Sequence, residues 1–503
     1  MFYKLEILNK HLMPEALMSN PPTEQTGLSS PSDEQRFTRS ISLMSNFSLG
    51  FTYLSPLTAV YSLFALSMTL AGPPAIWWIL IAAAGQMLVA MIFGEVASQY
   101  PITGGLYPWS RILWGKKYAW IAAWIYLWAL VVTITSIAEY SATFVATLFD
   151  YSQSAPHLLF TSVVLLLLMM IVNLSGTKNL ARVARIGFWC EIISVIALGI
   201  YLLIFHRTQP LSVLFDAMGS TGSSGSYSHA FMSASLLGLF MFFGFEACGN
   251  VAEEVKNPGR KIPVAMMLSI FFGAISAIIS VLGYLLSYPN LSAIVSGKID
   301  NPIPEILNNA LGPQGEKIFI VVAVIAMLSC ILSLQAALSR LLFSFSRDNM
   351  LPASHWMAKI SRNNVPDNAM IVSCLLPLLI CVWVYYQPDN LARITAFAVV
   401  GIYISFQMVV LAALRKRLKG WKPSGSWTLG SFGLLVNILA LAYGLFGIWL
   451  LCQPGSGDSF LDKWIVLIGL AIVLLSGALY LFIARPYEKT EQGSHYQQHL
   501  PAE

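Results

Sequence analysis

Three glutamates lie in a segment that directly follows an apolar run. The stretch "SASLLGLFMFF" leads directly into "GFEACGNVAEEVKNPGRKIP" at residues 244–263, which carries Glu246, Glu253 and Glu254. A carboxylate within a membrane-length apolar segment is costly unless it is paired or hydrated, so such groups are functional candidates. Glu246 could bind an ammonium group, orient the backbone or handle a proton. Alternatively, it could accept hydrogen bonds from amides that an unwound helix leaves free.

A fourth acid, Glu191, lies near the start of another apolar run, in "ARVARIGFWCEIISV". A carboxylate at this place could take up a proton or pair with a bound cation. An ion pair with Arg182 or Arg185 is the structural alternative.

The composition shows which elements must position these acids. Of the 503 residues, 56% are hydrophobic and 11% are charged, whereas soluble domains carry about 25% charged residues. Apolar runs of about 20 residues, the length that crosses a bilayer as a helix, recur along the chain. The runs are continuous rather than alternating, which favours helices over a β-barrel. The sequence therefore predicts an all-α integral membrane protein.

Hydropathy and punctuation by Gly, Pro and polar residues predict twelve transmembrane helices. Their expected ranges are 43–70, 75–98, 118–148, 157–174, 183–206, 230–252, 263–287, 317–345, 368–386, 391–414, 427–452 and 461–484.

The basic residues predict the orientation of these spans. When both tails and alternate loops are placed inside, 24 of the 29 Lys and Arg residues fall on that side. This is the positive-inside pattern, so both termini are expected in the cytoplasm of a multi-pass plasma membrane protein, in the cell inner membrane if the cell is Gram-negative. The net charge of +5 reflects this loop bias, and no nucleic acid partner is expected.

Two of the spans carry signs of interruption. Pro56 lies in the middle of the first span, where it removes a backbone donor and clashes with the preceding turn. The sixth span contains Gly244, Gly249 and Asn250 around Glu246. If the first ten spans form two sets of five, spans one and six correspond to each other. Matched broken helices of this kind indicate an inverted-repeat transporter with its site at the breaks.

Three stretches resemble the amino acid–polyamine–organocation (APC) permeases. They are "FFGFEACGNVAEEVKNPGRKIP", "GEVASQYPITGGLYPWSRILWG" and "ALSRLLFSFSRDNMLP", which look like the exits of the family's sixth, second and eighth spans. The resemblance covers roughly residues 40 to 480. It implies a five-plus-five inverted-repeat (LeuT-type) core with broken helices 1 and 6, two additional helices, and alternating access. The resemblance also places Glu191 near the position at which some proton-coupled relatives have a lysine, and that lysine stands in for a sodium ion.

The first span departs from many family members. They have a Gly-Ser-Gly-like run whose amides hold a substrate carboxylate, whereas this chain has "YLSPLT" at residues 53–58, closer to the polyamine-type members. Because Pro56 has no N–H, a nest of amides for a carboxylate is weakened. Amines are therefore favoured over plain α-amino acids as the predicted substrates.

The resemblance and the side-chain types together give three groups of candidate residues. Substrate contacts are expected from Tyr53, Leu54, Ser55, Pro56, Thr58, Trp124, Leu127, Trp128, Phe242, Phe243, Gly244, Phe245 and Glu246. Candidates for coupling to a proton or small cation are Glu191, Ser329 and Ser333. A cytoplasmic gate is expected from Glu95, Glu253, Glu254, Arg340 and Arg347, with the acids pairing with these arginines or with the basic loops.

The predicted organisation is a disordered cytoplasmic tail over 1–40, repeats over 41–210 and 211–420, two further helices over 421–486, and a cytoplasmic tail over 487–503. The predicted function is secondary-active transport of amino acids or related amines and polyamines, by proton symport or exchange. The alternatives are a plain α-amino acid permease and a transporter-like nutrient sensor without substantial flux. No enzymatic activity, cofactor or metal is expected, and the predicted state is a monomer or homodimer.

Overall fold

The computed structural model describes residues 39–489 apart from 221–225, 300, 387–390 and 455–459. The chain divides into two units, residues 1–36 and 37–503, and all of the described residues belong to the second. The predicted N-terminal tail over 1–40 lies outside the described residues except for Arg39 and Ser40. The predicted C-terminal tail lies outside them beyond Lys489.

The described part of the chain is helical, and its one pairing of extended backbone is an isolated parallel bridge between Ile41 and Val255. Ten long helices are α3 (Trp77–Gln99), α5 (Lys116–Leu148), α6 (Ala155–Leu174), α7 (Thr177–Phe205), α11 (Pro258–Ser287), α13 (Pro302–Arg347), α15 (Asp367–Tyr386), α16 (Leu391–Leu418), α17 (Gly433–Leu451) and α18 (Phe460–Ala484). Short helices connect them: η1 (Pro73–Ile76), α4 (Leu106–Leu113), η2 (Leu211–Phe215), α12 (Leu291–Val295), α14 (Ser354–Met357), η5 (Gly430–Phe432) and α19 (Pro486–Lys489).

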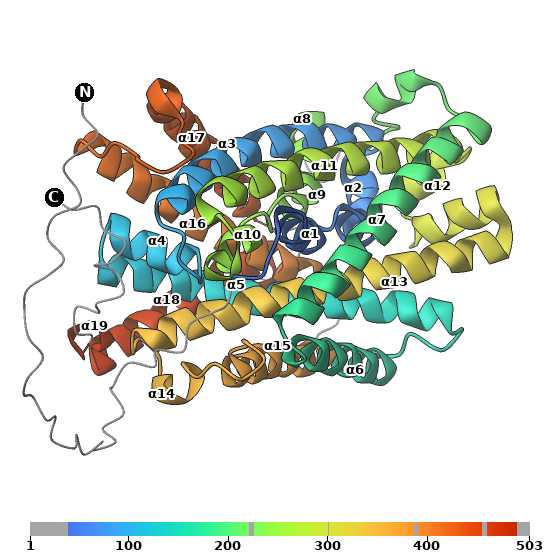
Figure 1. Cartoon of the computed structure of the whole chain (residues 1–503). Coiled ribbons are helices and arrows are strands. Elements are labelled where there is room, and N and C mark those ends of the chain that lie inside the picture. Colours follow the sequence, from blue (N-terminus) through green and yellow to red (C-terminus); the bar gives the residue numbers. More distant parts are fainter. Residues whose placement is uncertain (1–38, 221–225, 300, 387–390, 455–459, 490–503) are drawn as a thin grey trace, which may run out of the picture. The chain divides into compact units, whose positions relative to one another are not determined.

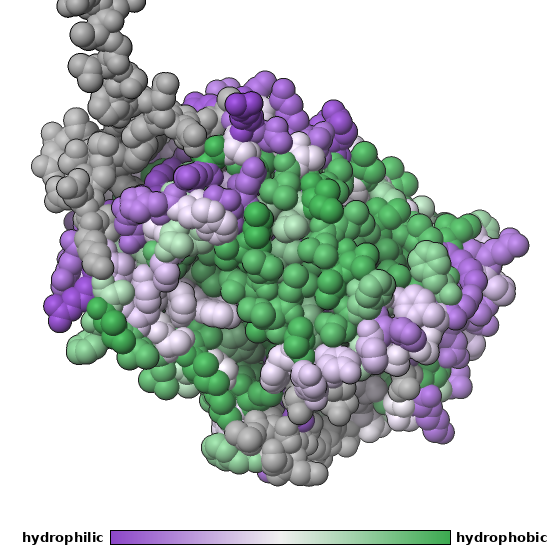
Figure 2. Space-filling model, turned by 90° about the horizontal axis from the view of Figure 1, so that it is seen from below, coloured by the Kyte–Doolittle hydropathy of each residue, from purple (hydrophilic) through white to green (hydrophobic). Residues whose placement is uncertain are grey.

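Among the described residues, eleven helical stretches are long and apolar enough to cross a membrane. Large apolar side chains are exposed along them, for example Phe160 on α6 and Leu379 on α15. Figure 2 shows a broad apolar face between hydrophilic rims. Such a surface is stable against lipid and not against water, which confirms the predicted all-α membrane class.

The predicted count of twelve spans is not reproduced by helix length, because the sixth predicted span is not one helix. Residues 230–252 fall in α8 (Tyr227–Ser233), α9 (Leu236–Met241), α10 (Ala247–Asn250) and the 3₁₀ turn η3 (Ala252–Glu254). Each piece is far shorter than the ~20 residues that a bilayer requires. The eighth predicted span also differs, since α13 begins at Pro302 and bends at Gly312, where φ is 72°.

The first predicted span is interrupted at Ser55, between α1 (Leu43–Leu54) and α2 (Pro56–Ala71). Ser55 has a left-handed backbone with φ of 37°, so the α1 hydrogen-bond ladder cannot continue through it. Pro56 then occupies the first position of α2, where its missing N–H costs nothing. The proline therefore starts the second half of the span instead of kinking a continuous helix.

The interrupted helices lie inside the bundle. Helix α1 contacts α7, α10, α11 and α13, and Figure 1 shows α1 and α10 among the longer helices. Helix α5 is the most enclosed span, with 83% of its most apolar window buried, whereas only 11% of the corresponding window of α18 is buried. The broken segments are therefore held by long helices, and α18 lies at the periphery.

Candidate functional site

The two breaks approach each other at the level of the backbone. Gly244 has a φ of 115°, and a Cβ atom added there would lie 2.7 Å from Leu54 N and 2.9 Å from the Tyr53 ring. Both the backbone conformation and the space therefore require glycine at this position. The last turn of α1 and the unwound residues 242–246 form one contiguous region, which we call the break region.

Glu246 is 1% exposed and belongs to the break region. Its Oε2 accepts a hydrogen bond from Gly244 N at 2.7 Å, and its Oε1 accepts one from the Tyr126 hydroxyl at 2.8 Å. Both donors are neutral, and no Lys or Arg of the described residues forms an ion pair with Glu246. A buried carboxylate in this state favours a proton or an ammonium group close by.

Glu191 of α7 contacts the first break. Its Oε1 accepts from Ser55 Oγ and from Leu57 N, both at 3.0 Å. Its Oε2 is buried without a hydrogen-bond partner among the described residues. The carboxylate contacts the first break and makes no ion pair with Arg182 or Arg185, which are exposed on α7.

Helix α13 provides hydroxyl groups next to α1. The Ser333 and Thr52 hydroxyls are 2.8 Å apart and buried. Ser329 packs against Gly187 of α7, where an added Cβ would lie 2.1 Å from Ser329 Oγ. The coupling candidates Glu191, Ser329 and Ser333 are thus placed along the junction of α1, α7 and α13.

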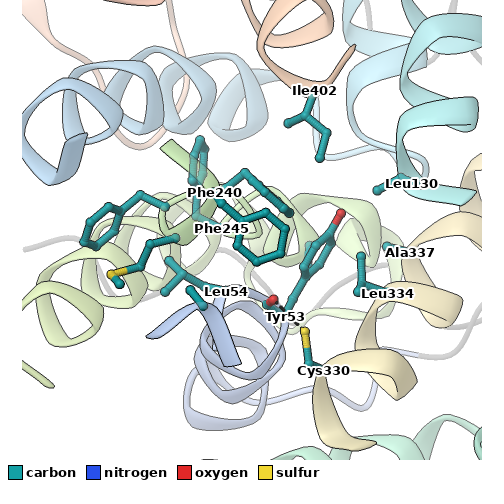
Figure 3. Close-up of a cluster of buried hydrophobic side chains, with 14 of the residues drawn as sticks. Tyr53, Leu54, Leu130, Phe240, Phe245, Cys330, Leu334, Ala337 and Ile402 are labelled. Atoms are coloured by element: carbon teal, nitrogen blue, oxygen red, sulfur yellow. Dashed lines mark hydrogen bonds between the residues drawn. The ribbon is translucent and has the colours of Figure 1, made fainter. Parts of the chain in front are cut away.

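Aromatic rings enclose the break region. The ring centroids of Tyr53 and Phe243 are 6.2 Å apart, and Phe245 packs against Phe93 and Phe406. Figure 3 shows the Tyr53 ring extending from α1 toward Leu130 of α5, with Cys330 of α13 beside its backbone. Cys330 Sγ donates to Tyr53 O at 3.1 Å. The Tyr53 hydroxyl is buried and has no hydrogen-bond partner among the described residues.

Among the third-span candidates, Trp124 contacts the peripheral helix α18. Trp124 points to α18, since its Nε1 donates to Val473 O at 2.9 Å and its ring stacks on Tyr480. Trp128 packs edge-on against Trp124, and Leu127 is buried. The α5 residue that reaches Glu246 is Tyr126, which the sequence reading missed. Residues two apart on a helix point to nearly opposite sides, so choosing the Trp124 face left Tyr126 out.

A layer of ion pairs lies beyond the break region, where α10 and η3 lead to α11. Glu254 pairs with Arg340 at 3.1 Å, with both side chains 1% exposed, and Glu253 pairs with Arg347 at 3.2 Å. Glu95 pairs with Arg417 in the basic last turn of α16, not with Arg340 or Arg347. The layer therefore connects η3 to α13 and α3 to α16.

Four further hydrogen bonds reinforce this layer. Glu253 Oε1 accepts from Thr103 N at 3.0 Å, and the Thr103 hydroxyl accepts from Glu253 N at 3.1 Å. The chain before α1 is also attached, because Ser40 N and Ile41 N both donate to Glu254 O at 2.9 Å. Charged groups buried this deeply are stable only when they are paired and hydrogen-bonded.

Known proteins are similar to this chain over most of its length. A family model for amino acid permeases matches residues 41–477. The "Amino-acid permease BAT1 homolog" of Oryza sativa subsp. japonica is 23% identical over 438 residues, which span 82% of this chain and 84% of that protein. The "Choline transporter" of Saccharomyces cerevisiae is 24% identical over 429 residues, which span 82% of this chain and 76% of that protein. The matched region includes both helix breaks and the ion-pair layer, which confirms the APC resemblance: the chain belongs to the amino acid permease family.

Proposed function

We propose that the chain is a secondary-active transporter of amine-bearing small solutes, and that Glu246 binds the substrate ammonium. One observation carries this proposal: a buried carboxylate at a helix break is held by two neutral donors and lacks a basic partner. An ammonium group would supply the missing positive charge. Phe243, Phe245 and Tyr53 belong to the same break region, and their rings would stack on a cation or exclude water.

The proposed mechanism is alternating access. In this scheme residues 41–210 and 211–420 are the two inverted repeats, and 421–486 adds two helices. A bundle of α1, α2, α3, α8–α10 and α11 rocks against a scaffold of α5, α6, α13 and α15. The Glu254–Arg340 and Glu253–Arg347 pairs cross between the two groups, which supports their proposed role as the gate that closes one side.

We propose that Glu191, Ser329 and Ser333 couple transport to a proton or small cation. The support is their position at the first break, where Glu191 contacts Ser55 and Ser333 contacts Thr52. A change in charge at Glu191 would alter the stability of the α1–α2 break directly. Exchange of one amine for another, without a coupled ion, is the alternative energy source.

The proposed setting is the plasma membrane with both termini in the cytoplasm, and the loop charge bias is its support. In that orientation the ion-pair layer faces the cytoplasm. Transport across the membrane, rather than sensing or catalysis, agrees with membership of a permease family.

Plain α-amino acid transport is the second candidate, because several relatives are named amino-acid permeases. The name of the choline transporter favours a quaternary or simple amine instead.

The test is a thermal-shift screen of amines and amino acids on the purified protein, followed by uptake into liposomes with imposed proton or sodium gradients. Saturable uptake of an amine supports the proposal. Binding without uptake in any gradient or in exchange mode would support the sensor alternative, and neither binding nor uptake of any amine would overturn the proposal.

A further inference from the structure

We propose that Glu191 is a specificity determinant. Its carboxylate takes the place at the start of α2 that the carboxylate of an α-amino acid would otherwise occupy, so the site selects amines without a carboxylate. This inference rests on the proposed function and narrows its substrate class.

The first turn of α2 is the natural anion-binding point of the first break. A helix N-terminus presents unpaired N–H groups and a positive dipole end to an anion. In this chain those groups are already satisfied. Pro56 has no N–H, Leu57 N donates to Glu191 at 3.0 Å, and Thr58 N donates to Ser55 Oγ at 3.4 Å. No free amide is left in this turn for a substrate carboxylate.

Hydrogen bonds hold Glu191 in this position. Ser55 Oγ donates to Glu191 Oε1, and the Thr58 hydroxyl lies 2.7 Å from Ser55 Oγ, so Thr58 donates to Ser55 in turn. Ser55 is also the residue at which the helix is interrupted. The carboxylate is thus bound to the break itself, and displacing it would cost its two hydrogen bonds, one of which Thr58 supports through Ser55.

The charges around the breaks also oppose a substrate carboxylate. Glu191 and Glu246 are both 1% exposed, and neither forms an ion pair with a Lys or Arg of the described residues. A carboxylate placed at the start of α2 would be repelled by Glu191, whereas an ammonium is attracted. Glu191 Oε2 has no hydrogen-bond partner within the described chain and can accept from a cationic N–H.

The test uses pairs of compounds that differ only by the α-carboxylate: putrescine with ornithine, cadaverine with lysine, agmatine with arginine, and tyramine with tyrosine. Each is added as a competitor of labelled amine uptake into liposomes that contain the full chain. For the best-bound pair we expect the amine to compete at a concentration at least about tenfold lower than its amino acid, the factor for one charge-assisted contact. Equal competition by both members of the pair, measured with the unmodified protein, would overturn the inference.

Two variants then separate two effects of Glu191 on the affinity ratio: its occupation of Leu57 N and its negative charge. Glu191→Ala empties the space and frees Leu57 N, so the ratio of amine to amino acid affinity should fall about tenfold. Glu191→Gln keeps an oxygen that can accept from Leu57 N, so the ratio should fall less. Glu139→Gln removes a buried carboxyl group several turns further along α5 than Tyr126 and should leave the ratio unchanged.

The outcomes distinguish the inference from the function on which it rests. If an amine is transported but Glu191→Ala keeps the ratio of the unmodified protein, the inference fails and the proposed function stands. If neither amines nor amino acids bind or move, both fail. A purely structural role of Glu191 would reduce uptake of both members of a pair equally, and would therefore leave the ratio unchanged.

Discussion

The Tyr126 hydroxyl donates to Glu246 Oε1 at 2.8 Å and joins the enclosed helix α5 to the break between α9 and α10. Gly244 N holds the other carboxylate oxygen at 2.7 Å. The carboxylate is thus oriented from two sides without being neutralised. A group arranged in this way can bind a cation in a fixed position, and it connects two sets of helices that are proposed to move against each other.

Replacing Tyr126 with Phe should weaken substrate binding with little effect on the fold, since only a hydroxyl is lost. A hydrogen bond to a charged group is worth about 1.5–3 kcal/mol, so KM for the amine should rise roughly tenfold or more. Uptake kinetics measure this. Tyr118→Phe is the control on the same helix, because the Tyr118 hydroxyl donates to Met408 O at 2.7 Å, away from the breaks. A KM equal to that of the control would contradict the role of Tyr126.

Gly244→Ala should abolish transport. The new Cβ would be strained by the φ of 115° and would also meet Leu54 N at 2.7 Å. Gly115→Ala separates these two effects, because Gly115 has a φ of 124° but no atom within 4 Å of an added Cβ. We expect Gly115→Ala to retain uptake with a modest loss of melting temperature. Equal losses in both variants would show that backbone strain alone matters and that contact between the breaks does not.

Glu254→Gln should destabilise the protein strongly, since it leaves Arg340 buried without its charge partner. Loss of one member of a buried pair costs about 3–5 kcal/mol. Thermal unfolding in detergent would measure this as a marked fall in melting temperature. The matched control is Asp150→Asn, whose partner Lys317 is 54% exposed and whose loss should cost less than about 1 kcal/mol. If both variants melt alike, the buried pair does not secure this end of the bundle.

Ser333→Ala should alter coupling more than substrate binding, because Ser333 contacts Thr52 of α1 and not Glu246. We expect gradient-driven uptake to fall several-fold while competition by unlabelled amine stays unchanged. Ser276→Ala is the control, since that buried hydroxyl bonds within its own helix, to Phe272 O and Gly273 O. A parallel loss of binding and uptake in Ser333→Ala would argue against a separate coupling site.

The sequence was sufficient to predict the membrane class and the break near Pro56, and it singled out Glu246, which lies buried at the second break. These features depend on local properties: apolar length, a missing N–H and a carboxylate in an apolar run. The exact residue at which the first span is interrupted could not be predicted. In the structure Ser55 breaks the span and Pro56 begins the next helix. A Pro in a sequence marks an interruption without showing on which side the helix ends.

The partners of the candidate residues could not be predicted in the same way. Tyr126 and Trp124 lie two residues apart in one apolar helix, and only the rotation of α5 determines which of them faces Glu246. Likewise, Glu95 pairs with Arg417, which is distant in sequence. Such pairings are fixed by how helices pack, and a single sequence contains no direct signal for helix rotation.

Binding of the substrate ammonium by Glu246 is tested most directly with Glu246→Gln, measured by uptake and by equilibrium binding of the same amine. Gln keeps the size of the side chain. Its one oxygen can still accept from Gly244 N, and its NH2 group can donate to the Tyr126 hydroxyl oxygen, so the change removes mainly the charge. We expect loss of uptake and a fall in affinity of roughly a hundredfold, the effect of removing a buried partner of an ammonium. Full transport with unchanged affinity would contradict this role of Glu246.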